Sequence, residues 1–175
     1  MRWLVLLPVL LSGCAGPLAF SLSARTAAGD PLAPGDEVHS DESFALTAEL
    51  DRPAYVYQLH QSPDGRVQVV RSLRAARGIV ALSTLRLDQQ PGLETAFVIA
   101  SLRALSEAQL FALAAAQPRE LLALAVLEKA KPTKPSPKPP PDCHKKQPQD
   151  CYRGPEPLRF TGRGVAVGYF QLNHK

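Results

Sequence analysis

The four histidines of this chain are the side chains best suited to acid–base chemistry near neutral pH. They are His39, His60, His144 and His174, and in the sequence none stands at catalytic or metal-ligand spacing from a partner. Ser62 and Asp64 do follow His60 closely. A nucleophile, a base and an orienting acid must converge beside an oxyanion site, however, and residues 63–65 are typical of a turn with a polar cap. We therefore predict no catalytic residues and no enzyme activity.

The amino terminus carries the motif with the most specific chemistry. The residues Leu11, Ser12, Gly13 and Cys14 follow an apolar run from Trp3, and Arg2 precedes that run. This junction resembles the lipobox of bacterial lipoproteins, which implies a diacylglycerol on the Cys14 thiol and a cleaved signal peptide over 1–13. The run is shorter than the about 20 apolar residues of a membrane-spanning helix. The alternative is an ordinary secretory signal that has a cysteine near its end by chance.

Two cysteines are left once Cys14 is assigned to the lipid. Cys143 and Cys151 stand close together, and an export compartment preserves disulfides, so we predict a disulfide between them. A loop this short stabilises the fold by about 2 to 3 kcal/mol. The alternative is a metal site formed by Asp142, Cys143, His144 and Cys151. It lacks the second closely spaced ligand pair that is usual for zinc, and we expect no metal and no cofactor.

The charge balance argues against a nucleic-acid-binding protein. Lysine and arginine total 20 and aspartate and glutamate 16, and only 6% of residues are aromatic. This small excess and the scarcity of stacking side chains do not suit nucleic acid. The lysines nevertheless gather in one stretch, as Lys129, Lys131, Lys134, Lys138, Lys145 and Lys146. They predict a flexible segment of concentrated positive charge.

Alternating apolar residues predict the strands that must position these groups. The alternation runs from Leu18 to Leu22 and from Phe44 to Leu50, and further strands are expected over 79–87 and 94–102. A hairpin is expected over 54–71 around the turn at 63–65. The fold class that follows is mainly β, a small antiparallel β-sandwich-like domain.

Two helices are predicted in the second half of the chain. Ser106 and Gln109 have capping-box spacing, and Pro118 suits the first turn of a second helix, which is rich in leucine as far as Leu127. A proline- and lysine-rich loop follows, extended over 131–141. A last strand over 160–172 returns to the sheet. The predicted organisation is a signal peptide at 1–13, a β-rich domain with two helices at 14–128, a flexible segment with the cysteine loop at 129–158 and a terminal strand at 159–175.

The middle of the chain resembles the domain of unknown function 4384 family. The resemblance covers residues 18–110 and rests on five stretches: Leu32 to Asp36, Phe44, Arg52 to Tyr57, Pro63 to Gly65 and Glu94 to Leu102. It implies a small, exported or surface-associated β-rich module without an established catalytic residue set. The chain departs from the family pattern over 71–77 and in its lysine-proline and cysteine loops.

The expected function is a lipid-anchored protein of the bacterial cell envelope. It would be a non-catalytic binding or scaffolding module, held to the membrane by the lipid on Cys14, whose basic arm meets an anionic envelope polymer or a protein partner. Ala15, rather than aspartate, follows the cysteine, which favours the outer membrane on its periplasmic face. The alternatives are a cell-wall-directed hydrolase, whose groups would converge from distant strands, and an accessory regulator of a signalling protein that docks through residues 120–128.

Overall fold

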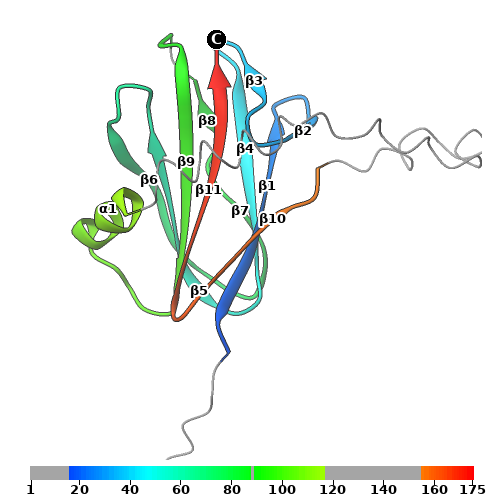
Figure 1. The fold of residues 1–175 in the computed structure, drawn as a ribbon. Coiled ribbons are helices and arrows are strands. Elements are labelled where there is room, and N and C mark those ends of the chain that lie inside the picture. The colour runs from blue at the N-terminus through cyan, green and yellow to red at the C-terminus, as the bar shows by residue number, and fades with distance from the viewer. Residues whose placement is uncertain (1–15, 88, 117–154) are drawn as a thin grey trace, which may run out of the picture.

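Two β-sheets packed face to face form the part of the chain that the computed structural model describes, residues 16–87, 89–116 and 155–175 (Figure 1). Sheet A has the strand order β10-β1-β4-β7, with β2 paired to β1 and β8 paired to β4. Its strands are β1 (Leu18–Thr26), β2 (Pro31–Leu32), β4 (Ser43–Leu50), β7 (Gly78–Ala81), β8 (Leu85–Arg86) and β10 (Leu158–Gly162). The predicted mainly β, sandwich-like class is confirmed.

Sheet B has the strand order β3-β11-β9-β5-β6. Its strands are β3 (Glu37–Val38), β5 (Ala54–Gln61), β6 (Val67–Ala75), β9 (Gly92–Ser101) and β11 (Val165–His174). Strands β5 and β6 form the predicted hairpin. The pairing of β3 with β11 is parallel, so the expectation of a purely antiparallel fold is corrected at this edge.

The main core lies between the sheets because each strand sends alternate side chains inward. In β1 the inward residues are Leu18, Phe20 and Leu22, all nearly inaccessible to solvent, whereas Ser21 and Ser23 on the other face are partly exposed. Strand β4 follows the same rule. Alternation of this kind is a local signal, which is why the sequence predicts both strands.

A second apolar cluster covers the outer face of sheet B. Helix α1 (Glu107–Ala115) lies on that face and packs its Leu110 against Phe97 and Ile99 of β9 (Figure 1). Strand β9 is therefore buried on both faces, which explains its nearly continuous apolar sequence. The hydroxyl of Tyr57 accepts a hydrogen bond from the Leu105 N–H at 2.8 Å and fixes the approach to the helix.

The described residues contain one helix, where the sequence predicts two. Helix α1 begins at the predicted capping box: Ser106 accepts from the Gln109 N–H, and the Gln109 side chain accepts from the Ser106 N–H. The second predicted helix, from Pro118 onward, lies outside the described residues.

The strand predictions over 79–87 and 159–175 require correction. Each contains two strands rather than one: β7 and β8 in the first case, β10 and β11 in the second. Gly162 marks the second break, because the backbone of Val165 comes so close that a Cβ on residue 162 would lie 1.8 Å from its carbonyl oxygen. Strand β10 consequently pairs with β1 in sheet A, whereas β11 joins sheet B.

Candidate functional site

The register of sheet B places Glu94 between two histidines. In the pairing of β5 with β9, His60 stands opposite Ala96, which lies two residues after Glu94 on the same face. In the pairing of β11 with β9, Leu172 stands opposite Glu94, and His174 follows Leu172 by two residues. Both histidines are thus diagonal neighbours of the carboxylate. All three side chains belong to the inward-facing set of their strands, at the end of the sandwich where the chain terminates.

The three side chains form a buried polar cluster at that end. The Nε2 atom of His60 lies 2.6 Å from Oε2 of Glu94, and the Nδ1 atom of His174 lies 3.5 Å from Oε1. The side chains of Glu94 and His174 are at most 1% exposed, and that of His60 is 12% exposed. At 3.5 Å the His174 Nδ1 and Glu94 Oε1 atoms fall short of a regular hydrogen bond, and both are buried without another partner.

Ser40 extends this cluster to the surface. Its Oγ atom lies 3.1 Å from the Nε2 atom of His174. The parallel pairing of β3 with β11 holds it there, because the Ser40 N–H donates to the Lys175 carbonyl and the Lys175 N–H donates to the Val38 carbonyl. Ser40 is exposed, although the histidine behind it is buried. We call Ser40, His174, Glu94 and His60 the Glu94 cluster.

One assignment of protons satisfies the Glu94 cluster with both histidines neutral. A carboxylate accepts only, so His60 donates from Nε2 and His174 presents its Nδ1–H to the second oxygen. The Nε2 atom of His174 is then an acceptor for the Ser40 hydroxyl. The order hydroxyl, imidazole and carboxylate is that of a nucleophile, its base and the group that orients the base.

The described residues contain no candidate metal site. Among residues 16–87, 89–116 and 155–175, no group of three histidine, cysteine, aspartate or glutamate side chains has a geometry able to hold a metal ion. The predicted lipid site Cys14, the predicted disulfide of Cys143 and Cys151, and the lysine-rich stretch all lie outside those residues, as does the alternative metal site.

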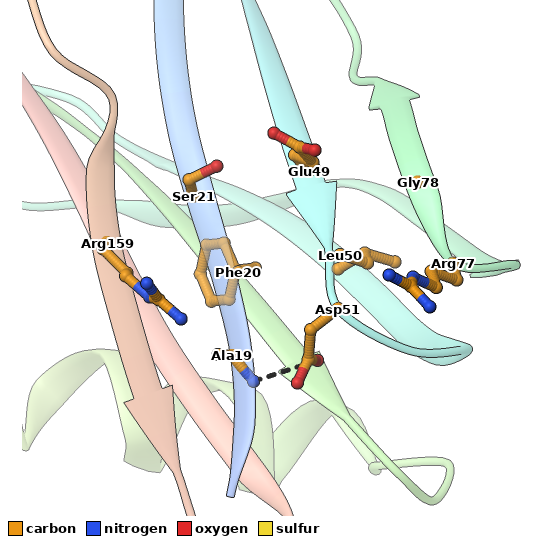
Figure 2. Close-up of a pocket in the computed structure, with 9 residues that line it drawn as sticks. All are labelled: Ala19, Phe20, Ser21, Glu49, Leu50, Asp51, Arg77, Gly78 and Arg159. Atoms are coloured by element: carbon orange, nitrogen blue, oxygen red, sulfur yellow. Dashed lines mark hydrogen bonds between the residues drawn. The ribbon is translucent and has the colours of Figure 1, made fainter.

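A shallow depression of about 340 Å³ lies on the outer side of sheet A, near the start of β1. Figure 2 shows the side chains of Arg159 and Arg77 on opposite sides of Asp51, with Glu49 above. Asp51 is already engaged, since it accepts from the Ala19 N–H at 3.1 Å and pairs with Arg52 at 3.2 Å. The two flanking arginines are exposed, and Glu49 and Asp51 line the same depression, so its lining carries two basic and two acidic side chains.

Arginines also gather in the loops at this end of the sandwich. Strand β1 begins there, Leu18 pairs with Gly162, and Leu50 pairs with Gly78. The loops carry Arg52, Arg77, Arg103 and Arg163, which we call the basic end. Asp51 is the one acidic residue in these described loops, which span 51–53, 76–77, 102–106 and 163–164.

The opposite end is acidic. Its loops and short strands carry Asp30, Asp36, Glu37, Asp41, Glu42 and Asp64. Three basic residues of the same end pair with members of this set, as Arg66 with Asp64, Arg86 with Asp41 and Lys175 with Glu37. The Glu94 cluster opens at this acidic end, which is also where the C terminus lies in Figure 1.

The predicted polar cap of the turn at 63–65 is confirmed. The Ser62 hydroxyl donates to Asp64 at 2.7 Å, and Asp64 also accepts from the Arg66 N–H, so this group is a turn cap. These two hydrogen bonds lower the pKa of Asp64 below its ordinary value, and the bond from Ser62 has the larger effect.

The Glu94 cluster could not be predicted from the sequence because its members come from four separate stretches of chain. The one available signal was a glutamate in an otherwise apolar strand.

No family model, no curated protein and no solved structure matches this chain. Within the described residues, no helix has the length and apolar character needed to cross a membrane. The resemblance to the domain of unknown function 4384 family therefore stays a prediction based on its five sequence stretches.

Proposed function

We propose that the protein is a lipid-anchored binding module of the bacterial cell envelope that lies with its basic end on the anionic membrane surface. The observation that carries the proposal is the position of the basic end. It surrounds the start of β1, only four residues after Cys14. A lipid on Cys14 would hold this end, and not the acidic one, against the bilayer.

The segment between Cys14 and the start of β1 is short, which supports an orientation with the basic end at the membrane. Four residues span at most about 14 Å when fully extended. The side chain of Arg52 shortens the path, since its Nη1 atom donates to the carbonyl of Gly16 at 3.0 Å. Screening at physiological ionic strength acts over about 8 Å, so exposed arginines at this end would feel the surface potential of anionic lipids.

Electrostatics and the lipid would then act together. A cationic side chain near an anionic surface contributes about 1 kcal/mol, and stable membrane attachment generally needs two signals. The acidic end would point away from the surface, where repulsion is least. The lysine-rich arm that the sequence predicts stays available for an anionic polymer or a protein partner, and Ala15 favours the outer membrane.

Vesicle binding tests the orientation without the lipid. The chain from Ala15 onward should sediment with vesicles that contain phosphatidylglycerol and not with pure phosphatidylcholine, and about 0.5 M sodium chloride should release it. Changing Arg77, Arg103 and Arg163 to serine should lower the affinity about 10-fold or more. All variants are made with the six lysines of residues 129–146 changed to glutamine, so that the arm does not mask the effect.

A matched control has the same change in charge at the other end. The triple change of Arg25, Arg66 and Arg86 to serine should leave vesicle binding nearly unaltered. Equal losses in the two triple variants would contradict the proposed orientation. Mass spectrometry of the mature amino terminus tests the anchor itself: an unmodified Cys14 in envelope-purified protein would contradict lipidation whatever the vesicles show.

A further inference from the structure

We infer that the Glu94 cluster is an ester-cleaving site in which Ser40 is the nucleophile and His174 its general base. This goes beyond a binding function, and it does not depend on the lipid anchor. Its basis is the convergence of groups that the sequence keeps far apart: Ser40 and His174 are 134 residues apart, and 80 residues separate Glu94 from His174.

The geometry has the two contacts that such a site requires, one between nucleophile and base and one between base and carboxylate. The Ser40 hydroxyl is exposed and lies 3.1 Å from the Nε2 atom of His174. The opposite ring nitrogen faces a carboxylate oxygen of Glu94 at 3.5 Å. Uncomplexed sites of this type often have one long contact that tightens when substrate binds. The buried Nδ1 and Oε1 atoms have no other partner, so each is left for the other.

The second histidine fixes the carboxylate. His60 lies 2.6 Å from Oε2 of Glu94, so one oxygen is held while the other faces His174. Burial makes the carboxylate more effective at stabilising a nearby positive imidazole than it would be in water. Glu94 and His60 are thus positioning residues, whereas Ser40 and His174 would meet the substrate.

The reaction balances with water as the only co-reactant. The Ser40 oxygen bonds to the acyl carbon while its proton moves to Nε2 of His174. The bond from the acyl carbon to the alcohol oxygen breaks, and the alcohol leaves with that proton. Water then attacks the acyl carbon and gives one proton to His174, which returns it to Ser40 as the carboxylic acid departs. The Asp41 N–H, next after the nucleophile, is the candidate oxyanion donor.

The surroundings select against negatively charged substrates. Of the three acidic residues near the nucleophile, Asp41 pairs with Arg86 and Glu37 pairs with Lys175, so the charge of Glu42, two residues after Ser40, is the one that repels a negatively charged substrate. Asp41 has a φ of 70°, in the left-handed region that few non-glycine residues adopt, so the turn beside Ser40 has an unusual backbone. The exposed position of Ser40 suits an acyl group on a neutral or cationic substrate that is presented from outside.

A fluorophosphonate probe tests the nucleophile directly. The Ser40 oxygen should displace fluoride from phosphorus, and intact mass with peptide mapping of the full mature chain in detergent should place the label on Ser40. Ser40→Ala should abolish labelling, and His174→Gln should slow it about 100-fold. The controls Ser62→Ala, at a half-buried position, and His39→Ala, at an exposed one, lie at the same end and should label like the wild type.

Turnover and the role of Glu94 need two further readouts. Hydrolysis of p-nitrophenyl acetate should depend on Ser40, and an analogue with a carboxylate beside the acyl group should react more slowly. Glu94→Gln should slow labelling about 10-fold, because the imidazolium loses its stabilising charge, while Glu94→Asp should restore part of the rate.

Three results would overturn the inference. The first is labelling of wild type no faster than Ser40→Ala, and the second is labelling spread over other exposed serines such as Ser72 and Ser106. The third is hydrolysis of p-nitrophenyl acetate that does not depend on Ser40. Circular dichroism spectra of His174→Gln and Glu94→Gln identify any loss of fold, and Ser40→Ala, an exposed substitution, decides the matter if either buried variant unfolds.

Discussion

The Nε2 atom of His60 lies 2.6 Å from Oε2 of Glu94, although 34 residues separate them in the chain. Since Glu94 is only 1% exposed, this hydrogen bond replaces part of the solvation that its carboxylate loses on burial. Glu94→Gln preserves the volume but removes the charge, and we expect the free energy of unfolding to fall by about 1 to 3 kcal/mol in urea titrations. The exposed change Glu156→Gln should leave it within about 0.5 kcal/mol, and equal effects would show that the contact carries no stability.

A glutamine joins the two sheets through a backbone clamp. Gln58 is fully buried, and its carboxamide donates to the Ser83 carbonyl at 2.8 Å and accepts from the Ser83 N–H at 2.7 Å. Gln58→Leu would leave both backbone groups without these partners, so we expect a loss of about 2 kcal/mol or more in the free energy of unfolding. Gln68→Leu, on the exposed side of β6, is the control. A neutral Gln58→Leu would mean that water replaces the amide.

Gln58 and Glu94 show which features of the structure the sequence alone does not predict. The strands around them were predictable, because alternation, the turn at 63–65 and the capping box are local signals. The partners of these two side chains were not predictable, because Ser83 meets Gln58 only through the packing of the two sheets, and His174 meets Glu94 only through the pairing of β11 with β9. The inward-facing positions of His60, Glu94 and His174 follow from a register that one sequence does not contain.

The same limit explains the corrected strands. The stretch from Phe160 to Leu172 alternates like one strand, so the pattern predicts a single strand there. The transfer of chain from sheet A to sheet B at Gly162 depends on the approach of Val165, a tertiary contact. The alternation of apolar residues therefore predicts that a segment is extended, but it does not predict which of the two sheets the segment joins.

Gly168 leaves room for an aromatic pair between the sheets. A Cβ on this residue would lie 2.6 Å from Cδ2 of Phe160 and 2.8 Å from Cζ of Phe20, whose rings are 5.3 Å apart. Gly168→Ala should therefore lower the free energy of unfolding by about 1 to 3 kcal/mol through overpacking. Gly16→Ala, where the nearest atom is the flexible end of Arg52 at 3.9 Å, should be nearly neutral.

A double-mutant cycle separates crowding from other effects of Gly168→Ala. In a Phe160→Ala background the space is already open, so adding Gly168→Ala should cost markedly less than it does in the wild type. Additive losses in thermal unfolding would contradict the packing explanation and point to the backbone instead.

The turn cap at Ser62 has a measurable electrostatic consequence. Its hydroxyl is the largest cause of the lowered pKa of Asp64, so Ser62→Ala should raise that pKa toward the ordinary aspartate value. A depressed carboxyl pKa adds stability above the unfolded pKa, and this is lost as the pH falls through the folded value. Carboxyl-carbon NMR titration measures the change. Ser72→Ala, on β6, should not alter it, and an unmoved Asp64 in Ser62→Ala would contradict the assignment.

The capping box of α1 predicts a selective loss of helix stability. Ser106 accepts from the Gln109 N–H, an amide that no turn of the helix satisfies, so Ser106→Ala should cost about 1 kcal/mol. Amide hydrogen exchange over 107–112 should accelerate more than exchange in β9, because the sheet keeps its own hydrogen bonds. Ser106→Asp retains a side-chain acceptor beside the helix amino terminus and should restore protection. If Ser106→Asp exchanges as fast as Ser106→Ala, the hydrogen bond of the Tyr57 hydroxyl to Leu105 holds the helix start without the cap.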